Sequence, residues 1–153
     1  MADETDGKPT PLKAVNKTAP EKDTIVIAED SPPNRKILAH LLEKLGFNII
    51  ACENGADAWE AMNDAKNERI VAVISDIMMP TMDGIQLLRH IRGQENLVAL
   101  PVILVTAISE KEYIAQAKEL KVNGYILKPV TFQRVTSKLQ ELFPHRVFPK
   151  IAA

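Results

Sequence analysis

The chain has 153 residues, of which 46% are hydrophobic and 25% are charged, and its formal net charge at pH 7 is -1. This composition is typical of one globular domain, and the scattered basic residues form no patch of the kind that binds nucleic acid or an anionic membrane. The most apolar run, "LVALPVILV", contains a proline and is far shorter than the roughly 20 residues that span a bilayer. From the scattered charge and the short apolar run we expect neither a nucleic-acid nor a membrane partner. The single cysteine, Cys52, excludes an internal disulfide, so we expect a cytoplasmic protein.

The N-terminal segment, residues 1–22, mixes charges, prolines and threonines with few bulky apolar side chains, and we expect it to be a flexible tail. Residues 23–143 are expected to form the one folded domain, and residues 144–153 a short C-terminal tail. Within the domain, short apolar runs occur at 24–28, 47–52, 70–75, 101–106 and 124–128. Their nearly continuous apolarity predicts five strands that are buried on both faces, which is typical of a parallel sheet.

The segments between these runs carry the periodicity of amphipathic helices. One apolar stripe consists of Ile37, Leu38, Leu41, Leu42 and Leu45. Ser31 before two prolines predicts the start of that helix, and Gly46 predicts its end. Ser109 and Glu112 resemble a capping box for a helix over 109–120. Alternating strands and helices predict a doubly wound α/β domain, and no segment remains for a second domain.

Polar side chains stand at the carboxyl ends of the predicted strands, where the functional crevice of an open parallel sheet lies. Glu29 and Asp30 follow the first strand and Asp76 the third, while Thr106 ends the fourth and Lys128 the fifth. Taken singly, each of these residues fits a plain strand end that meets water. If the central strands are neighbours, however, three carboxylates, a hydroxyl and an ammonium group converge.

A purely structural role does not explain this set, because three neighbouring acids repel one another and raise the pKa of at least one. A hard divalent cation such as Mg²⁺ removes the repulsion and typically bridges carboxylates to a phosphate. Lys128 would then pair with one anionic oxygen, and Thr106 would donate a hydrogen bond to another. The set therefore predicts a phosphoryl site, with Asp76 as the nucleophile that receives the group.

Four sequence blocks carry a family resemblance. The strings "AEDSPPNRKIL", "VISDIMMPTMDGIQLL", "VILVTA" and "GYILKPV" resemble the signature blocks of bacterial response-regulator receiver domains, the CheY-like family. The resemblance covers residues 24 to about 143, and the spacing of Asp30, Asp76, Thr106 and Lys128 is similar to that of the family. It implies a five-stranded, flavodoxin-like parallel sheet with strand order 2-1-3-4-5.

The resemblance also implies a set of functional residues. They are the phosphoryl acceptor Asp76, the Mg²⁺ ligands Glu29, Asp30, Asp76 and the backbone carbonyl of Met78, the phosphoryl contacts Thr106, Lys128 and the backbone N–H of Ala107, and the switch residues Thr106 and Tyr125. A cis Lys128-Pro129 bond is implied as well, and Asp83 is a candidate cap for the helix that begins at Gly84.

The function that the resemblance implies is a signalling switch, rather than a classical enzyme, in a two-component phosphorelay. A partner histidine kinase or phosphotransfer protein would phosphorylate Asp76. A surface formed by the fourth helix, fifth strand and fifth helix would then bind a downstream target protein. The chain is expected to be a stand-alone receiver, either monomeric or dimeric after phosphorylation.

Three alternative functions fit the sequence less well. A phosphatase of the haloacid dehalogenase type needs a second acid two residues after its nucleophile, and Met78 occupies that place. A flavodoxin-like nucleotide binder needs a phosphate loop rich in Ser, Thr and Gly, where this chain has the acidic "EDSPPN". A receiver used only as a scaffold would keep the fold without phosphorylation, and the complete set of acids with Thr106 and Lys128 argues against it.

Met78 and Ile108 occupy positions that flank the path of hydrolytic water in the family. Both are apolar and neither orients a water molecule, so we expect slow self-dephosphorylation. Changing Met78 to Asn together with Ile108 to Glu is expected to speed the loss of phosphate from the phosphorylated protein. An unchanged decay rate in the double variant, followed by intact mass, would contradict this expectation.

Overall fold

The structure is a computed structural model that describes residues 14–16, 23–64 and 69–148 of the chain. The strands are β1 (Ala14–Asn16), β2 (Thr24–Ala28), β3 (Asn48–Cys52), β4 (Ile70–Asp76), β5 (Val102–Thr106) and β6 (Gly124–Leu127). The helices are α1 (Pro32–Lys44), α2 (Gly55–Asp64), α3 (Gly84–Gly93), α4 (Lys111–Glu119) and α5 (Phe132–Leu142). The described residues also include the short 3-10 helices η2 (Glu95–Leu97) and η3 (Ile108–Glu110).

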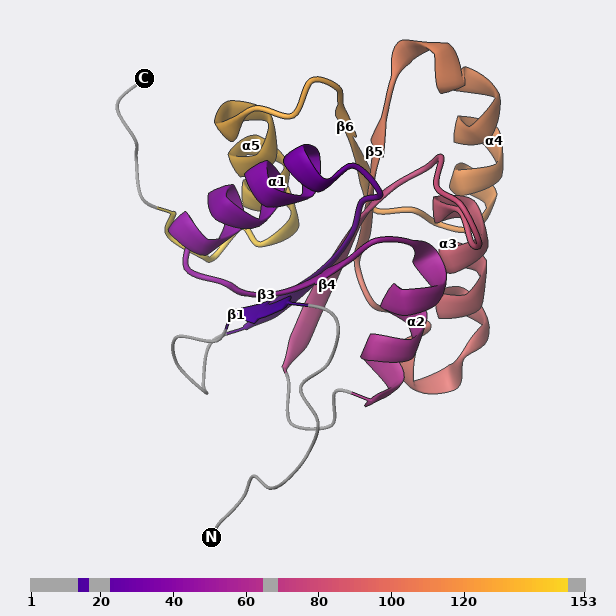
Figure 1. Ribbon diagram of the computed structural model, residues 1–153, viewed down its shortest axis with the longest axis horizontal. Coiled ribbons are helices and arrows are strands. Elements are labelled where there is room, and N and C mark those ends of the chain that lie inside the picture. The colour runs from indigo at the N-terminus through magenta and orange to yellow at the C-terminus, as the bar shows by residue number, and fades with distance from the viewer. Residues whose placement is uncertain (1–13, 17–22, 65–68, 149–153) are drawn as a thin grey trace, which may run out of the picture.

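The strands form one sheet in the order β1-β3-β2-β4-β5-β6. Strands β2 to β6 are parallel to their neighbours and correspond to the five predicted strands. Numbered in chain order, these five strands have the order 2-1-3-4-5, which confirms the predicted doubly wound α/β fold. Figure 1 shows α1 and α5 on one face of the sheet and α2, α3 and α4 on the other.

Both faces of the sheet are buried, as the nearly continuous apolar runs predict. In β2, Ile25 and Ile27 belong to the core cluster on the side of α1 and α5. Val26 and Ala28 belong to the second cluster, which packs against α2, α3 and α4. Because successive side chains of a strand point to opposite faces, each strand contributes to both clusters. Cys52, at the end of β3, is buried in the second cluster.

The ends of α1 lie where the sequence predicts them. The hydroxyl oxygen of Ser31 accepts a hydrogen bond from the N–H of Asn34 at 3.4 Å. Beyond the last turn, Gly46 has a φ of +99°, a left-handed conformation that favours glycine. The predicted stripe is too wide, however. Ile37 is 50% exposed and does not cover the sheet, whereas Leu38 and Leu42 are buried.

The predicted capping box of Ser109 and Glu112 is wrong. The chain first forms η3, and α4 begins only at Lys111. The carboxylate that caps this segment belongs to Glu110, which accepts a hydrogen bond from the N–H of Ala107 at 2.7 Å. The 3-10 turn after β5 therefore moves the start of α4 to Lys111. As a result Glu110, rather than Glu112, accepts the capping hydrogen bond.

Strand β1 pairs antiparallel with β3 at the edge of the sheet. It lies inside the segment 1–22, which the sequence predicts to be a flexible tail, and the rest of that segment lies outside the described residues. At the other end, residues 144–148 pack on the domain. Arg146 forms an ion pair with Asp23 at 2.9 Å, and the rings of Phe148 and Phe47 lie 6.2 Å apart.

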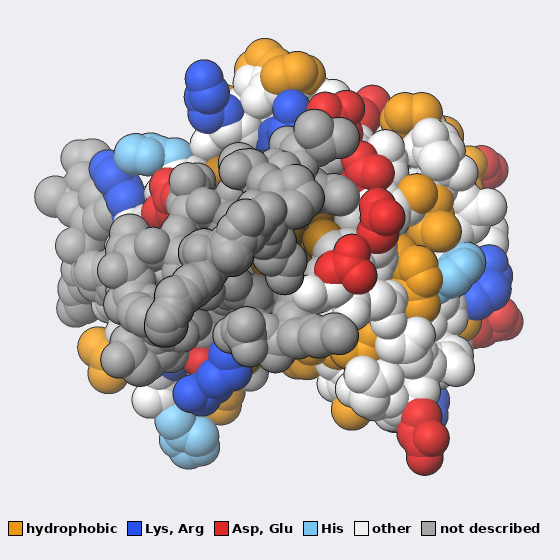
Figure 2. All heavy atoms as spheres, turned by 60° about the horizontal axis from the view of Figure 1, so that its bottom comes forward, with side chains coloured by type: hydrophobic (Ala, Val, Ile, Leu, Met, Phe, Trp, Pro, Cys, Tyr) orange, Lys and Arg blue, Asp and Glu red, His pale blue; other side chains and the backbone are white. Residues whose placement is uncertain are grey.

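The face shown in Figure 2 lies at the amino ends of the parallel strands. Among the described side chains on this face, several acidic ones line up in a band, whereas the other acidic side chains and Lys and Arg are scattered. No helix in the described part of the chain is long and apolar enough to cross a membrane.

Gly84 is required by a close backbone approach. A side-chain Cβ at this position would collide with the carbonyl oxygen of Asp76 and lie 3.0 Å from the Cα of Ile77. We expect Gly84→Ala to lower the free energy of unfolding by about 1–3 kcal/mol, because the backbone around Asp76 must shift. Urea denaturation followed by circular dichroism measures this effect.

Gly93, at the other end of α3, provides a matched control because a Cβ there would have no neighbour within 4 Å. Gly93→Ala is expected to be neutral or to stabilise by up to about 1 kcal/mol. If Gly84→Ala were as stable as the Gly93→Ala variant, the close approach at Asp76 would not constrain the fold.

Candidate functional site

The sheet register brings the predicted site residues together. Ala28 of β2 is paired with Ser75 of β4, so the next residues, Glu29 and Asp76, lie side by side. On the other side of β4, Asp76 is paired with Val105 of β5. The carboxyl ends of the central strands thus meet at one edge of the sheet, as an open parallel sheet requires.

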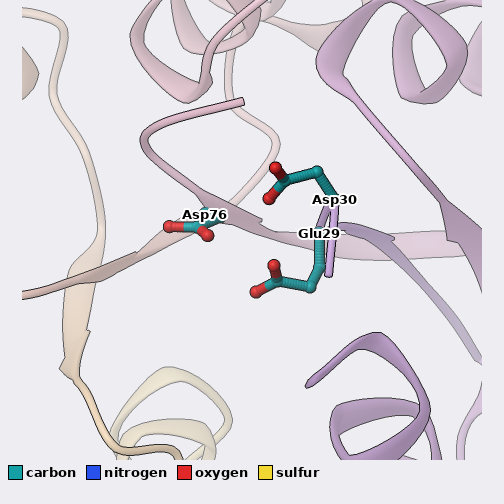
Figure 3. Close-up of side chains that lie close together, drawn as sticks. All are labelled: Glu29, Asp30 and Asp76. Atoms are coloured by element: carbon teal, nitrogen blue, oxygen red, sulfur yellow. The ribbon is translucent and has the colours of Figure 1, made fainter. Parts of the chain in front are cut away.

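Glu29, Asp30 and Asp76 form an acidic cluster at this edge. Each offers a carboxylate oxygen, and these three oxygens all lie within 4.8 Å of one another. Figure 3 shows the carboxylates of Glu29 and Asp30 directed toward Asp76. Glu29 and Asp76 are buried, whereas Asp30 is exposed. A set of hard oxygen ligands that is open to solvent on one side fits a divalent cation such as Mg²⁺, which keeps several waters.

The Asp76 carboxylate is only 3% exposed and is held at both oxygens. Its Oδ2 accepts a hydrogen bond from Lys128 Nζ at 3.0 Å, and its Oδ1 accepts one from the N–H of Ile77 at 2.8 Å. Burial raises the pKa of the Asp76 carboxyl above its ordinary value, although Lys128 and the Ile77 N–H oppose this shift. The charged form of Asp76 thus depends on its cationic partner.

Glu29 lies in a similar environment. Burial raises the pKa of Glu29 from the ordinary 4.5 to about 7, and the charges of Asp76 and Asp30 add to the shift. The N–H of Ser31 donates to Glu29 Oε2 at 3.0 Å and opposes the shift, as does the charge of Lys128. The acids therefore repel one another when no cation is near.

Lys128 is fixed to this edge by its backbone and its side chain. Its N–H donates to the carbonyl of Thr106 at 2.8 Å. Burial lowers the pKa of Lys128, but its hydrogen bond with Asp76 and the charges of Asp76 and Glu29 outweigh burial and leave the pKa raised. Lys128 is therefore a positive charge at the mouth of the site. The predicted cis Lys128-Pro129 bond is confirmed.

Thr106 and Ala107 lie at the end of β5 beside Glu110, a residue that the sequence did not predict to be near the site. The Oε1 atom of Glu110 lies 3.2 Å from the hydroxyl oxygen of Thr106 and accepts from the N–H of Ala107 at 2.7 Å. The sequence did not point to Glu110, because the 3-10 turn that makes Ala107 the N-cap and brings Glu110 back to it was not predicted.

Two predicted residues lie at the periphery of the site. Tyr125 donates from its hydroxyl to the carbonyl of Ile114 in α4 at 3.3 Å, so it links β6 to α4. The side chain of Met78 is 49% exposed. The metal role of the Met78 carbonyl stays a prediction, and the side chain of Ile108 lies outside the described part of the structure.

Comparison with known proteins identifies relatives of the chain. The sequence model of the response regulator receiver domain matches residues 25–140. Chemotaxis protein CheY-3 of Vibrio cholerae is 39% identical over 119 residues, which are 78% of this chain and 90% of that protein. Chemotaxis protein CheY of Pseudomonas aeruginosa is 37% identical over 120 residues, covering 78% of this chain and 94% of that protein.

Solved structures share the fold. The signal receiver domain of a histidine kinase from Syntrophus aciditrophicus is 31% identical, with a TM-score of 0.70 over 86% of this chain and 98% of that chain. The receiver domain of a Pseudomonas aeruginosa sensor histidine kinase is 27% identical, with a TM-score of 0.70 over 78% of this chain and 96% of that chain. That second structure has a magnesium ion coordinated in its active site cleft.

The raised pKa of Glu29 gives a pH-dependent stability. Because the pKa rises from 4.5 to about 7 on folding, the contribution of Glu29 to stability is full below pH 4.5 and is lost as the pH rises through 7. At about pH 8 without Mg²⁺, Glu29→Gln is expected to raise the free energy of unfolding by on the order of 1–3 kcal/mol. Urea titrations from about pH 5 to about pH 8 measure the difference.

Millimolar Mg²⁺ is expected to narrow the gap between Glu29→Gln and the wild-type protein, because the cation stabilises the charged cluster. Glu119→Gln is the matched control, since Glu119 is exposed at the end of α4, and it is expected to change stability by no more than about 0.5 kcal/mol. A Glu29→Gln variant less stable than wild type at the highest pH, without Mg²⁺, would contradict the repulsion described for the cluster.

Proposed function

This chain belongs to the family of response regulator receiver domains, and from that premise we propose that Asp76 is the phosphoryl acceptor of a two-component phosphorelay. A partner histidine kinase or phosphotransfer protein would supply the phosphoryl group. The observation that carries the proposal is the buried Asp76 carboxylate, with Lys128 3.0 Å away and two further carboxylates within 4.8 Å. This arrangement suits Mg²⁺-dependent phosphoryl transfer to Asp76. It does not suit a phosphatase, which needs a second acid at the place of Met78 to hydrolyse its substrate.

In the proposed reaction, a carboxylate oxygen of Asp76 attacks the phosphorus of a phosphohistidine. A P–O bond to Asp76 forms, and the P–N bond to the donor imidazole breaks, with the electron pair leaving on the imidazole nitrogen. The product is an acyl phosphate on Asp76. The hydrogen bond from the Ile77 N–H fixes the orientation of the carboxylate before attack.

The residues that would hold Mg²⁺ are Glu29, Asp30, Asp76 and the backbone carbonyl of Met78. When bound, the ion would supply positive charge that offsets the carboxylates and the phosphoryl oxygens. Lys128 already pairs with Asp76, and after transfer its ammonium group would pair with a phosphoryl oxygen instead. The hydroxyl of Thr106 and the N–H of Ala107 would donate to another phosphoryl oxygen.

The switch would follow from the movement of Thr106 toward the new charge. Tyr125, which is hydrogen-bonded to the backbone of α4, would change position with it. We propose that this alters the surface formed by α4, β6 and α5, which would bind a downstream target. Phosphorylation shifts this equilibrium only by its differential interaction with the two states. A cytoplasmic location, and a monomer or a phosphorylation-dependent dimer, belong to the same proposal.

The test is incubation of the purified protein with acetyl phosphate and Mg²⁺, followed by intact mass. We expect the mass to rise by one phosphoryl group, because a small acyl phosphate replaces the phosphohistidine donor at the same site. Asp76→Asn and addition of a chelator are both expected to abolish the rise.

Asp83→Asn is a matched control in the same turn, because it removes a carboxylate that caps α3 and accepts from the Gln86 N–H at 2.8 Å. It is expected to leave phosphorylation intact. An unchanged mass of the wild-type protein, under conditions that label a known receiver domain, would show a scaffold that keeps the fold without the reaction.

A further inference from the structure

The two phosphoryl donors at the end of β5 are already occupied by an internal carboxylate. Glu110 Oε1 accepts from the N–H of Ala107 at 2.7 Å and lies 3.2 Å from the Thr106 hydroxyl oxygen. These are the same two groups that the proposed function assigns to a phosphoryl oxygen. One carboxylate oxygen of Glu110 therefore stands where an oxygen of the incoming group would be received.

The hydroxyl of Thr106 has only one proton to give. Besides Glu110, the carbonyl oxygen of Ala107 lies within reach, at 3.1 Å. A charged carboxylate is the stronger acceptor of the two, because hydrogen bonds to ionised groups are roughly twice as strong as neutral ones. Glu110 is therefore the favoured acceptor for the Thr106 hydroxyl.

The charge of Glu110 also reaches the rest of the site. It adds to the causes that raise the pKa of Asp76, and it helps to raise the pKa of Lys128. The charge of Glu110 would thus repel an anionic phosphoryl group that approaches Asp76. It also attracts Lys128, the cation that would pair with that group.

A plain capping role explains only part of these contacts. A glutamate three residues after the N-cap commonly accepts from the N-cap backbone N–H, as Glu110 does from Ala107. Capping does not require the additional contact between Glu110 and the Thr106 hydroxyl. It also does not require that Glu110 occupy the two groups that would donate to the phosphoryl oxygen. The two roles predict different effects of substitution on phosphorylation.

We propose that Glu110 is a positioning residue that competes with the phosphoryl group for the Thr106 hydroxyl and the Ala107 N–H. In the unphosphorylated state Glu110 occupies both donors, and it withdraws when a phosphoryl oxygen takes them. The inference rests on the proposed function of Asp76 and adds a residue that sets how readily that function proceeds.

The withdrawal of Glu110 would also move the start of α4. Glu110 ends η3 and is followed directly by Lys111, the first residue of α4. The same helix accepts the hydroxyl of Tyr125 through the carbonyl of Ile114. Because Glu110 is joined directly to α4 through the backbone, its release from the two donors would also shift the start of the helix that Tyr125 contacts.

The experiment compares the rate of phosphorylation by acetyl phosphate in wild type, Glu110→Gln and Glu110→Ala. Both variants remove the competing charge, and the glutamine keeps an oxygen that accepts from the Ala107 N–H. We expect both to be phosphorylated faster, by on the order of tenfold, because the donors no longer have to be freed from a charged acceptor. The alanine variant excludes a new contact from the glutamine amide as the cause.

A second readout is the dissociation constant for beryllium fluoride, a noncovalent phosphoryl mimic, measured with Mg²⁺ present. Both Glu110 variants are expected to bind it more tightly than wild type, whereas loss of a cap alone would lower stability without raising affinity. Glu119→Gln removes the same charge from the far end of α4 and is expected to change neither quantity by more than about twofold.

The outcomes separate this inference from the proposed function. If wild type is not phosphorylated, the proposed function fails first. If wild type is phosphorylated on Asp76 but both Glu110 variants react no faster and bind the mimic no more tightly, competition by Glu110 is overturned. If the alanine variant does not fold, the glutamine variant decides alone by the same two measurements.

Discussion

Burial of the Asp76 carboxylate at the end of β4 is the constraint on which the rest of the site depends. A carboxylate that is only 3% exposed is tolerated because Lys128 and the Ile77 N–H satisfy it, and a buried charge without such partners is strongly destabilising. The end of β6 must therefore deliver Lys128 to this point. For the same reason Gly84 must let α3 approach the Asp76 backbone closely.

The strand order converts this local constraint into a site. Because β2 and β5 flank β4, the acids that follow β2 and the hydroxyl that ends β5 lie on either side of Asp76. The same convergence sets Glu29 against Asp76, and with burial it raises the pKa of Glu29 to about 7. The clustered carboxylates destabilise this edge of the sheet when no cation is bound. The same carboxylates make the edge suitable for binding a cation together with a phosphoryl group. Stability and function are thus opposed at one edge of the sheet.

Most of the fold could be predicted from the sequence, because strands buried on both faces leave continuous apolar runs; the order 2-1-3-4-5 came from the family resemblance. What failed depends on three-dimensional detail. Periodicity shows which side of α1 is apolar but not how wide its contact is, so Ile37 was misplaced. Strand β1 pairs through its backbone and needs no apolar pattern. The contact of Glu110 with Thr106 depends on the 3-10 turn, which no spacing of residues reveals.

The central claim, that the converging charges serve one phosphoryl acceptor, is tested most directly by locating the modified residue. The protein is treated with acetyl phosphate and Mg²⁺ and then reduced with borohydride, which converts an acyl phosphate on aspartate to homoserine, and the peptides are sequenced by mass spectrometry. We expect homoserine at position 76 alone, and none without Mg²⁺. Reduction products at Glu29 or Asp30, with position 76 unmodified, would contradict the account.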